Sequence, residues 1–355
     1  MKLEDLGYPA ELEKWRIENG FQDFEVGRVV AEHKERYLVR TEEGELEAEI
    51  TGNLRFTANS REDFPAVGDW VCLTVQDADF ALIHKILPRF STISRRAVGQ
   101  FGEIQILATN IDSAFLVLSA DRDFSVNRLE RYLTICHASN VSPLIVLTKT
   151  DLIEAERLAE IKGAILCRIR EVPVLAISNT TQAGYEALKE RIEKGKTYCM
   201  LGSSGVGKST LLNNLSGRTV MRTDTVSHST QRGRHVTTHR ELIVLENGGL
   251  LVDNPGMREV GIADAARGLA ATFDRIFHFS QTCRFKDCSH TRETGCAVLE
   301  AVEKGEIDKG AYESYLKMER ENAHFESSAA ERRKKDKDFG KMVKNYTKNI
   351  NRNKN

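Results

Sequence analysis

Alternating polar and apolar residues mark the first quarter of the chain as β-rich. The clearest segment is Glu45–Ile50, ELEAEI, in which every second side chain is apolar. That period of two predicts a strand with one side facing solvent. The other strand candidates, with a turn-like Glu42-Glu43-Gly44 between them, are Val26–Val30, Arg36–Thr41, Trp70–Val75 and Ala81–Ile86. Five short strands between residues 25 and 90 predict a small barrel, and an OB-fold is the favoured architecture.

A different rhythm begins near residue 104, where short apolar runs alternate with helical patterns. The first helical pattern places Leu129, Tyr132, Leu133 and Cys136 at i, i+3, i+4, i+7 spacing. The apolar runs are Ser113–Leu118, Leu144–Thr148, Val174–Ser178 and Tyr198–Leu201. Alternating strands and helices predict a mostly parallel sheet covered on both faces, and ligands bind such sheets at the carboxyl ends of the strands.

These patterns predict an α/β multidomain protein. An N-terminal segment and β-barrel occupy residues 1–95, an α/β domain 96–270, a helical domain 271–326 and a basic, disordered tail 327–355. The tail holds ten Lys or Arg and three Asp or Glu, a net charge of +7 in a chain whose formal charge is −1. Such a tail is either solvated or contacts nucleic-acid phosphates, and composition leaves both open.

Composition narrows the class of protein. The chain is 41% hydrophobic and 29% charged, which is ordinary for a globular protein. No apolar run reaches the length of a membrane span, and the N-terminus lacks the apolar core of a signal peptide. We therefore expect a cytoplasmic protein with no membrane partner.

A phosphate-binding loop follows the apolar run Tyr198–Leu201. Gly202–Ser209, GSSGVGKS, fits G-x-x-x-x-G-K-[ST] between a strand and a helical stretch. In this motif backbone N–H groups bind phosphate oxygens, Lys208 reaches the β- and γ-phosphates, and the Ser209 hydroxyl binds Mg²⁺. The predicted phosphate-binding residues are Gly202, Ser203, Ser204, Gly205, Val206, Gly207, Lys208, Ser209, Thr210 and Gly256.

Gly256 belongs to a second motif, Asp253-Asn254-Pro255-Gly256, after the apolar run Leu250–Val252. An Asp at a strand end near a phosphate loop can hold Mg²⁺, and the glycine N–H can meet the γ-phosphate. The polar stretch before it resembles a switch loop, in which Thr237 or Thr238 would complete the Mg²⁺ shell.

A base-reading loop precedes the phosphate loop. Thr148-Lys149-Thr150-Asp151 ends an apolar run, and the Asp151 carboxylate suits the N1–H and amine donors of guanine, which adenine does not present as a pair. The Lys149 stem would cover the base, and Ser178-Asn179 after the next strand would offer an N–H to the guanine O6. In ordinary GTPases the phosphate loop comes first, so this order predicts a circular permutation.

At this point the sequence resembles the circularly permuted ribosome-assembly GTPases of the RsgA or YjeQ type. The resemblance covers nearly the whole chain through GRVVAEHKERYLVRTEEGELEAEI, FPAVGDWV, LERYL, TKTDL, GSSGVGKSTLLN, GRHVTTH, DNPGMRE, CRFKDCSH and GCAV. It implies an OB-fold barrel, a permuted GTPase domain and a zinc-binding C-terminal domain. It also implies GTP hydrolysis stimulated by the small ribosomal subunit during late maturation of that subunit, with contacts to its rRNA.

Three positions depart from the family pattern. Thr148 stands where Asn is common and lacks its amide. Asn179 stands where Ala is frequent, and Val236 replaces a frequent threonine, which leaves Thr237 and Thr238 as the Mg²⁺ candidates.

A cluster of metal-binding residue types lies within the predicted helical domain. Cys283, Cys288, His290 and Cys296 form C-x4-C-x-H-x5-C. Three thiolates and one imidazole make the closed tetrahedral set of a structural zinc site. The alternative, buried thiols beside an unrelated histidine, fits poorly with the polar residues around them. We expect one structural Zn²⁺ besides the Mg²⁺ that accompanies GTP.

Three functions compete for these motifs. A subunit-stimulated GTPase acting as a monomer is favoured over a nucleotide-dependent binding module and a metabolic kinase, because a kinase needs no guanine-reading loop. Many GTPases carry Gln after Asp-x-x-Gly to orient water, whereas this chain has Met257, so intrinsic hydrolysis should be slow. His235 in the switch-like loop is the candidate catalytic residue, with packing or rRNA contact as its alternative role.

Overall fold

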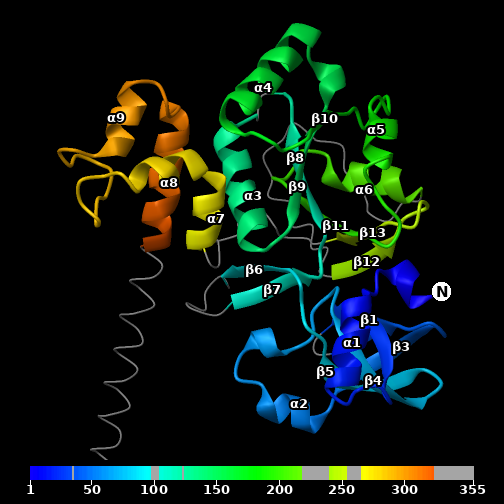
Figure 1. Ribbon diagram of the computed structural model, residues 1–355. Helices are drawn as coiled ribbons and strands as arrows, with labels where there is room; N and C mark the ends of the chain where they lie inside the picture. The colour runs from blue at the N-terminus through cyan, green and yellow to red at the C-terminus, as the bar shows by residue number, and fades with distance from the viewer. Residues whose placement is uncertain (34–35, 97–103, 122–123, 218–239, 254–264, 324–355) are drawn as a thin grey trace, which may run out of the picture. The chain divides into compact units, whose positions relative to one another are not determined.

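The computed structural model describes residues 1–33, 36–96, 104–121, 124–217, 240–253 and 265–323 (Figure 1). The chain forms two compact units. Of the described residues, those in 1–96 and 104–274 belong to the first unit, and those in 275–323 belong to the second. Among the described residues no helix is long and apolar enough to cross a lipid bilayer.

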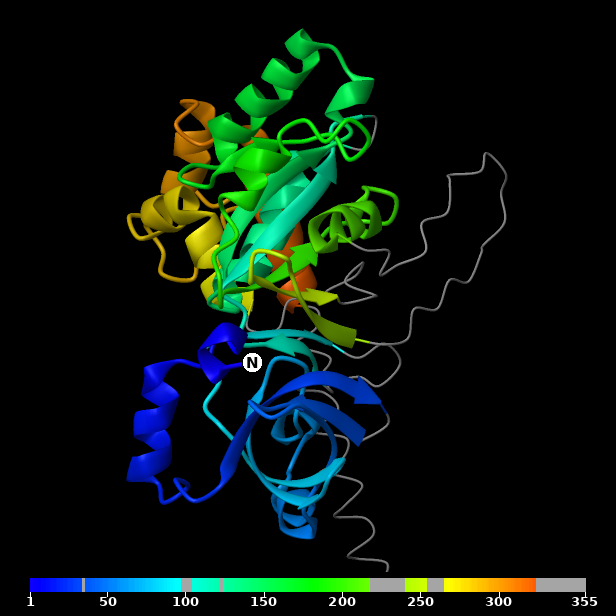
Figure 2. The ribbon, with the colours of Figure 1, turned by 90° about the vertical axis from the view of Figure 1, so that its right-hand side faces the viewer.

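The first unit begins with a closed five-stranded barrel, as the alternation predicted (Figure 2). Its strands are β1 (Glu25–His33), β2 (Arg36–Arg40), β3 (Glu45–Ile50), β4 (Trp70–Asp77) and β5 (Phe80–Ile86). β1 pairs with both β2 and β4, while β3 and β4 each pair with β5, which closes the barrel. Val29, Val39, Leu73 and Ile83 are fully buried in its interior.

Short helices surround these strands. They are the 3₁₀ helix η1 (Leu3–Leu6), α1 (Ala10–Glu18), α2 (Gly52–Thr57) and the 3₁₀ helix η2 (Arg61–Asp63). The Thr51 hydroxyl caps α2 by accepting from the Leu54 N–H. No residue of α2 is buried, so the hydrophobic pattern gave no signal for this helix.

The α/β part of the same unit has a parallel sheet. Its central strands are β8 (Ser113–Ser119), β9 (Ser142–Thr148), β10 (Val174–Ala176), β11 (Thr197–Leu201) and β13 (Leu250–Asp253), in the order β10-β9-β8-β11-β13. β12 (Arg240–Val244) pairs antiparallel with β13. β6 (Thr92–Arg96) and β7 (Ile104–Thr109) form a separate two-stranded sheet.

Helices cover both faces of this sheet, as expected for strands with apolar residues on both sides (Figure 1). On one face α3 (Val126–Ala138) and α4 (Ala155–Arg168) pack in the core that contains Leu116 and Leu147. On the other face α5 (Tyr185–Lys189) and α6 (Lys208–Ser216) pack against Val117 and Val146. Because successive strand side chains point to opposite faces, the two cores share the same strands.

The barrel and the α/β sheet are continuous within this unit. β1 of the barrel pairs antiparallel with β12, with Ala31 opposite Glu241. Arg28 is 1% exposed and donates hydrogen bonds to the carbonyls of Leu6, Gly68 and Asn110. Burial lowers the pKa of Arg28 to about 10, and its hydrogen bonds offset the cost of burying the guanidinium.

The remaining elements are helical. α7 (Ala265–Thr272) ends the first unit and packs on α3, where a Cβ at Gly268 would lie 2.3 Å from the Thr134 carbonyl oxygen. α8 (Asp274–Ser280) leads into the second unit, which also contains α9 (Ala297–Glu303) and a helix over 309–323. The second unit is thus helical around the Cys/His cluster, as the sequence predicted.

Candidate functional site

The carboxyl ends of the parallel strands lie side by side. In the register of the sheet Ser119 of β8 is opposite Thr148 of β9, and Leu201 of β11 is opposite Leu116 of β8. The two guanine-loop candidates, the phosphate loop and Asp253 all follow or end such strands. The fold therefore gathers these residues at the edge where parallel sheets bind ligands.

The phosphate loop connects β11 to α6, and its glycines are required by close contacts. A Cβ at Gly202 would lie 2.4 Å from the Val117 carbonyl oxygen. Gly207 has φ +95°, and a Cβ there would lie 2.5 Å from the Asn179 amide nitrogen. Since α6 begins at Lys208, the loop presents the N-terminus of a helix, which attracts anions.

Lys208 lies over this loop. Its Nζ donates to the carbonyl oxygens of Gly202, at 2.7 Å, and Ser203, at 2.6 Å. The ammonium thus stays within the loop that the sequence assigns to phosphate binding. A second cation also reaches Ser203, because Arg128 of α3 donates from Nη1 to the Ser203 hydroxyl at 3.0 Å. Sequence reasoning missed Arg128, since its only signal was a place on the helix predicted around Leu129.

The first guanine-loop candidate, Thr148–Asp151, is hydrogen-bonded to the phosphate loop. Thr148 is fully buried, and its Oγ1 donates to the Val206 carbonyl oxygen at 2.6 Å. Lys149 adopts the left-handed conformation with φ +57°, which is uncommon for a residue other than glycine. Its Nζ lies 2.9 Å from Asp121 Oδ2. Asp151 is exposed in the following 3₁₀ helix η3 (Thr150–Leu152), so its carboxylate can receive a ligand.

The second guanine-loop candidate, Ser178-Asn179, is also hydrogen-bonded to the phosphate loop. Ser178 is 1% exposed, and its hydroxyl accepts from the N–H groups of Thr180 and Thr181. Asn179 donates from Nδ2 to the Gly207 carbonyl oxygen at 2.9 Å. The two base-loop candidates therefore bond to consecutive carbonyls of one loop.

Several predicted residues lie outside the described part of the chain. They are Thr237, Thr238, His235, Gly256 and Met257. Asp253 is described: it ends β13, is half-buried and lies opposite Glu241 of β12. Its position at the same sheet edge agrees with a Mg²⁺-binding role.

The four cysteine and histidine residues of the second unit come together. Their ligand atoms all lie within 4.8 Å of one another. His290 Nδ1 lies 3.6 Å from Cys283 Sγ and 3.5 Å from Cys296 Sγ, and these two sulfurs are 3.9 Å apart. Ligands about 2.0–2.3 Å from a tetrahedral zinc lie roughly 3.5–3.8 Å from one another. The cluster therefore fits a four-coordinate ion.

Backbone groups support this cluster. His290 adopts φ +57°, and its carbonyl accepts from the Tyr312 hydroxyl at 2.6 Å. Burial opposes the thiolate form of Cys283, but hydrogen bonds from the Val298 and Ala297 N–H groups outweigh it, and the pKa of Cys283 is lowered. Thiolates are the form that binds zinc, so the start of α9 favours metal binding.

Comparisons with known proteins agree with this geometry. A family model described as RsgA GTPase matches residues 86–263. A curated relative from Bacteroides thetaiotaomicron, named small ribosomal subunit biogenesis GTPase RsgA 1, is 39% identical over 343 residues, 96% of each chain. A relative of the same name from Oceanobacillus iheyensis is 42% identical over 318 residues, 87% of this chain and 90% of its own.

The chain belongs to the RsgA GTPase family. Two solved structures share the fold of this RsgA-family protein. YjeQ from Thermotoga maritima has a TM-score of 0.62 at 27% identity and covers 83% of this chain and 96% of its own. YloQ, whose structure is titled a circularly permuted GTPase, has a TM-score of 0.62 at 26% identity and covers 86% of this chain and 97% of its own.

Membership of the family confirms the predicted fold and activity. The RsgA-family protein is a GTP hydrolase with an N-terminal barrel and a circularly permuted GTPase fold. In a circularly permuted domain the chain starts at a different strand while the strands keep their places in the sheet. This explains why the guanine-loop candidate precedes the phosphate-loop candidate in the sequence.

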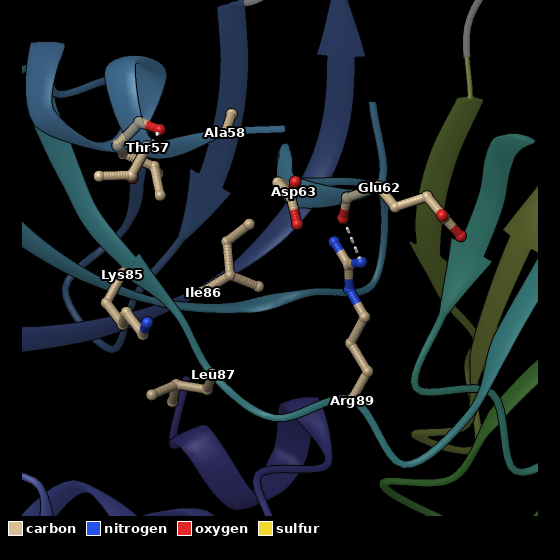
Figure 3. A pocket seen from close by; sticks show the side chains of 9 residues that line it. Thr57, Ala58, Glu62, Asp63, Lys85, Ile86, Leu87 and Arg89 are labelled. Atoms are coloured by element: carbon tan, nitrogen blue, oxygen red, sulfur yellow. Dashed lines mark hydrogen bonds between the residues drawn. The ribbon is translucent and has the colours of Figure 1, made fainter. Parts of the chain in front are cut away.

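A hollow on the barrel is separate from this site. The cavity, of about 450 Å³, is lined by Leu54, Thr57, Ala58, Glu62, Asp63, Lys85, Ile86, Leu87 and Arg89 (Figure 3). Arg89 is held by the buried Asp69 carboxylate, with Nε 2.8 Å from Oδ1, and by the carbonyls of Glu62 and Phe64. The arginine therefore serves the structure of the barrel wall, and none of the nucleotide-site candidates lines this cavity.

Proposed function

We propose that this RsgA-family GTPase binds the small ribosomal subunit and its rRNA, acts in late maturation of that subunit, and hydrolyses GTP slowly until the subunit stimulates it. The relatives carry the subunit in their names. The main support for the proposed nucleotide site is the pair of hydrogen bonds from Thr148 and Asn179 to the phosphate loop. They bring the two base-loop candidates and the phosphate loop into one site.

In this site the base and the phosphates are bound by different loops. Asp151 accepts hydrogen bonds from guanine N1–H and its amine, the Lys149 stem covers the base plane, and a backbone N–H after Ser178 meets O6. The N–H groups of the loop Gly202–Ser209 surround the phosphates. Lys208 moves from the carbonyls of Gly202 and Ser203 to the phosphate oxygens, which carry more negative charge.

The residues also fit two metal ions. Ser209 and Asp253, with Thr237 or Thr238, would hold the Mg²⁺ that accompanies GTP and neutralises phosphate charge. Cys283, Cys288, His290 and Cys296 would hold one Zn²⁺. Four protein ligands leave no open position, so this ion stabilises the C-terminal domain and takes no part in hydrolysis.

The sheet offers a route from the barrel to the hydrolysis machinery. β12 follows the switch-like segment in the sequence, pairs with β13 on one side, and pairs with β1 of the barrel on the other. A partner docked on the barrel would therefore act on a strand next to both Asp253 and the switch. This arrangement supports stimulation by a bound subunit.

The remaining proposals concern organisation and location. We place the barrel domain at 1–95, the GTPase domain at 96–270, the zinc-binding domain at 271–326 and the basic tail at 327–355. The protein acts as a monomer with no membrane partner. It is located in the cytoplasm, where it meets assembling subunits. A tail of +7 net charge supports contact with rRNA phosphates.

The test is GTP turnover with and without purified small subunits, with ATP as the control nucleotide. We expect slow turnover alone, strong stimulation by subunits, and neither with ATP. Lys208→Ala serves as the inactive control, because it removes the ammonium that lies at the Gly202 and Ser203 carbonyls and would bind the phosphates. Equal GTP turnover with and without subunits would contradict the proposed stimulation.

A further inference from the structure

Two cations reach Ser203, the second residue of the phosphate loop. Lys208 Nζ donates to its carbonyl oxygen at 2.6 Å, and Arg128 Nη1 of α3 donates to its hydroxyl at 3.0 Å. Hydrogen bonds with an ionised donor are roughly twice as strong as those between neutral groups. All three residues are half-buried, so water competes with these bonds less than it would at an open surface. The start of the loop is therefore held at Ser203.

The helix α3 presents Tyr132 to the same serine. Arg128 and Tyr132 are four positions apart, the spacing that places two side chains on one face of a helix. Burial raises the pKa of the Tyr132 phenol, whereas its hydrogen bond with the Ser203 hydroxyl and the charge of Arg128 oppose that rise. The serine oxygen accepts from the guanidinium, which leaves its own O–H to donate to the phenol oxygen. The Ser203 side chain is thus bonded to two residues of α3.

The helix α3 is itself firmly anchored within the first unit. Its Glu130 is 2% exposed and accepts two hydrogen bonds from Arg168 of α4, with Nε 3.0 Å from Oε1 and Nη2 2.6 Å from Oε2. One turn further, Thr134 Oγ1 lies 3.2 Å from the Thr272 hydroxyl of α7. Moving α3 would separate a buried ion pair, which is costly. Bonds from this helix therefore tie Ser203 to a rigid support.

The second half of the phosphate loop is held by other elements. The carbonyls of Val206 and Gly207 accept hydrogen bonds from the two base-loop candidates, at 2.6 Å and 2.9 Å. Between these anchors and Ser203, the residues Ser204 and Gly205 are exposed. The loop is thus fixed on both sides of an exposed turn, and the side that starts the loop depends on α3.

We propose that Arg128 is a positioning residue for the phosphate loop. In the proposed nucleotide site Lys208 leaves the Ser203 carbonyl for the phosphate oxygens, and its bond to the loop is lost. The bond from Arg128 to the hydroxyl then keeps Ser203 in place. The loop holds its shape through binding, so GTP and GDP do not have to order it. This inference rests on the proposed nucleotide site.

The test is a double-mutant cycle of Arg128→Ala and Ser203→Ala, with Arg128→Lys as the conservative variant. A fluorescent GDP analogue gives the dissociation constant, and steady-state hydrolysis with subunits gives KM and kcat. Arg128→Ala should weaken GDP binding about 3- to 10-fold and raise KM with kcat within about twofold of the parent, a loss typical of one hydrogen bond. The double variant should lose no more than either single variant, because both remove the same bond. Arg128→Lys, which keeps a charged donor, should retain most of the affinity.

Arg157→Ala is the matched control. Arg157 lies on α4 in the same unit and donates from Nη1 to Glu160 Oε2 at 2.8 Å within its own helix. Its GDP affinity should equal that of the parent. Unchanged affinity in Arg128→Ala would overturn the proposal even if the melting temperature falls, since the contact would then be structural alone. Additive losses in the double variant would overturn it too, because Arg128 would not act through Ser203. A parent protein that fails to bind GDP would instead refute the nucleotide site itself, and this inference with it.

Discussion

Lys149 Nζ lies 2.9 Å from Asp121 Oδ2, and this ion pair joins the segments that follow β8 and β9 at the carboxyl edge of the parallel sheet. Asp121 follows β8, and its Oδ1 accepts from the Ser119 hydroxyl at 2.8 Å. Lys149 follows β9 in a left-handed conformation. The carboxylate therefore fixes the position of the Lys149 ammonium, and with it the lysine stem that would cover the base plane in the proposed site.

Replacing Asp121 should remove the ion pair that fixes the Lys149 side chain. Asp121→Ala is expected to weaken GDP binding by roughly 2- to 5-fold, since a half-exposed ion pair contributes up to about 1 kcal/mol. The effect should shrink as salt is raised, because salt screens the pair in the parent protein. Titration with a fluorescent GDP analogue at low and high salt measures both. A loss of affinity that does not depend on salt would argue against the ion pair as its cause.

The sequence predicted this site from motifs whose function requires particular residue types. The phosphate loop and Thr148–Asp151 are recognisable because phosphate and guanine binding demand particular residues at fixed spacing. The five barrel strands follow from their alternation, and α3 from its helical spacing around Leu129. These features depend on neighbours in the chain.

The supporting contacts could not be predicted in the same way. Asp121 pairs with a residue 28 positions later, and Arg128 contacts a serine 75 positions away. Asn214 looked like one more polar position on α6, although it bonds to Asn179. Such partners are chosen by the tertiary arrangement of strands and helices, and one sequence without that arrangement carries no signal for them.

Guanine specificity should reside in Asp151. The residue is exposed in the middle of η3, where its carboxylate can accept from the N1–H and amine of guanine. Asp151→Asn should weaken GTP binding at least 10-fold and favour xanthine nucleotides, whose base presents an acceptor in place of the amine. Competition between GTP and XTP for the parent and the variant measures this. GTP affinity equal to that of the parent would remove Asp151 from the base site.

The C-terminal cluster should carry one tightly bound zinc per chain. The Cys283 and Cys296 sulfurs and the His290 Nδ1 lie 3.5 to 3.9 Å from one another, close to the spacing of ligands around a tetrahedral zinc. Metal analysis of protein purified without added zinc should find about one equivalent, because ligand deprotonation and folding drive binding. Cys288→Ala should lose the metal and unfold the second unit while GDP binding persists. Exposed Cys167, which lies outside the cluster, provides the control Cys167→Ala, which should keep its zinc. A metal-free protein with a folded second unit would refute the site.

His235 should act in subunit-stimulated hydrolysis, although it lies outside the described residues. Met257 follows Asp253-Asn254-Pro255-Gly256 and cannot orient water, so another group must do so. His235 precedes β12 in the sequence, and β12 pairs with β1 of the barrel. A subunit docked on the barrel could therefore move the histidine toward the attacking water, where its ring can accept or donate a proton.

The variant His235→Ala separates catalysis from RNA contact. If the histidine is catalytic, the variant should bind GTP and the subunit as the parent does, yet lose about 100-fold or more in subunit-stimulated turnover, the lower end of the range for general acid–base catalysis. Its turnover without subunits should change little. Full stimulation with normal binding would exclude the catalytic role. Weakened subunit binding with unchanged intrinsic turnover would assign His235 to the rRNA contact instead, and co-sedimentation with subunits measured beside the rates distinguishes these outcomes.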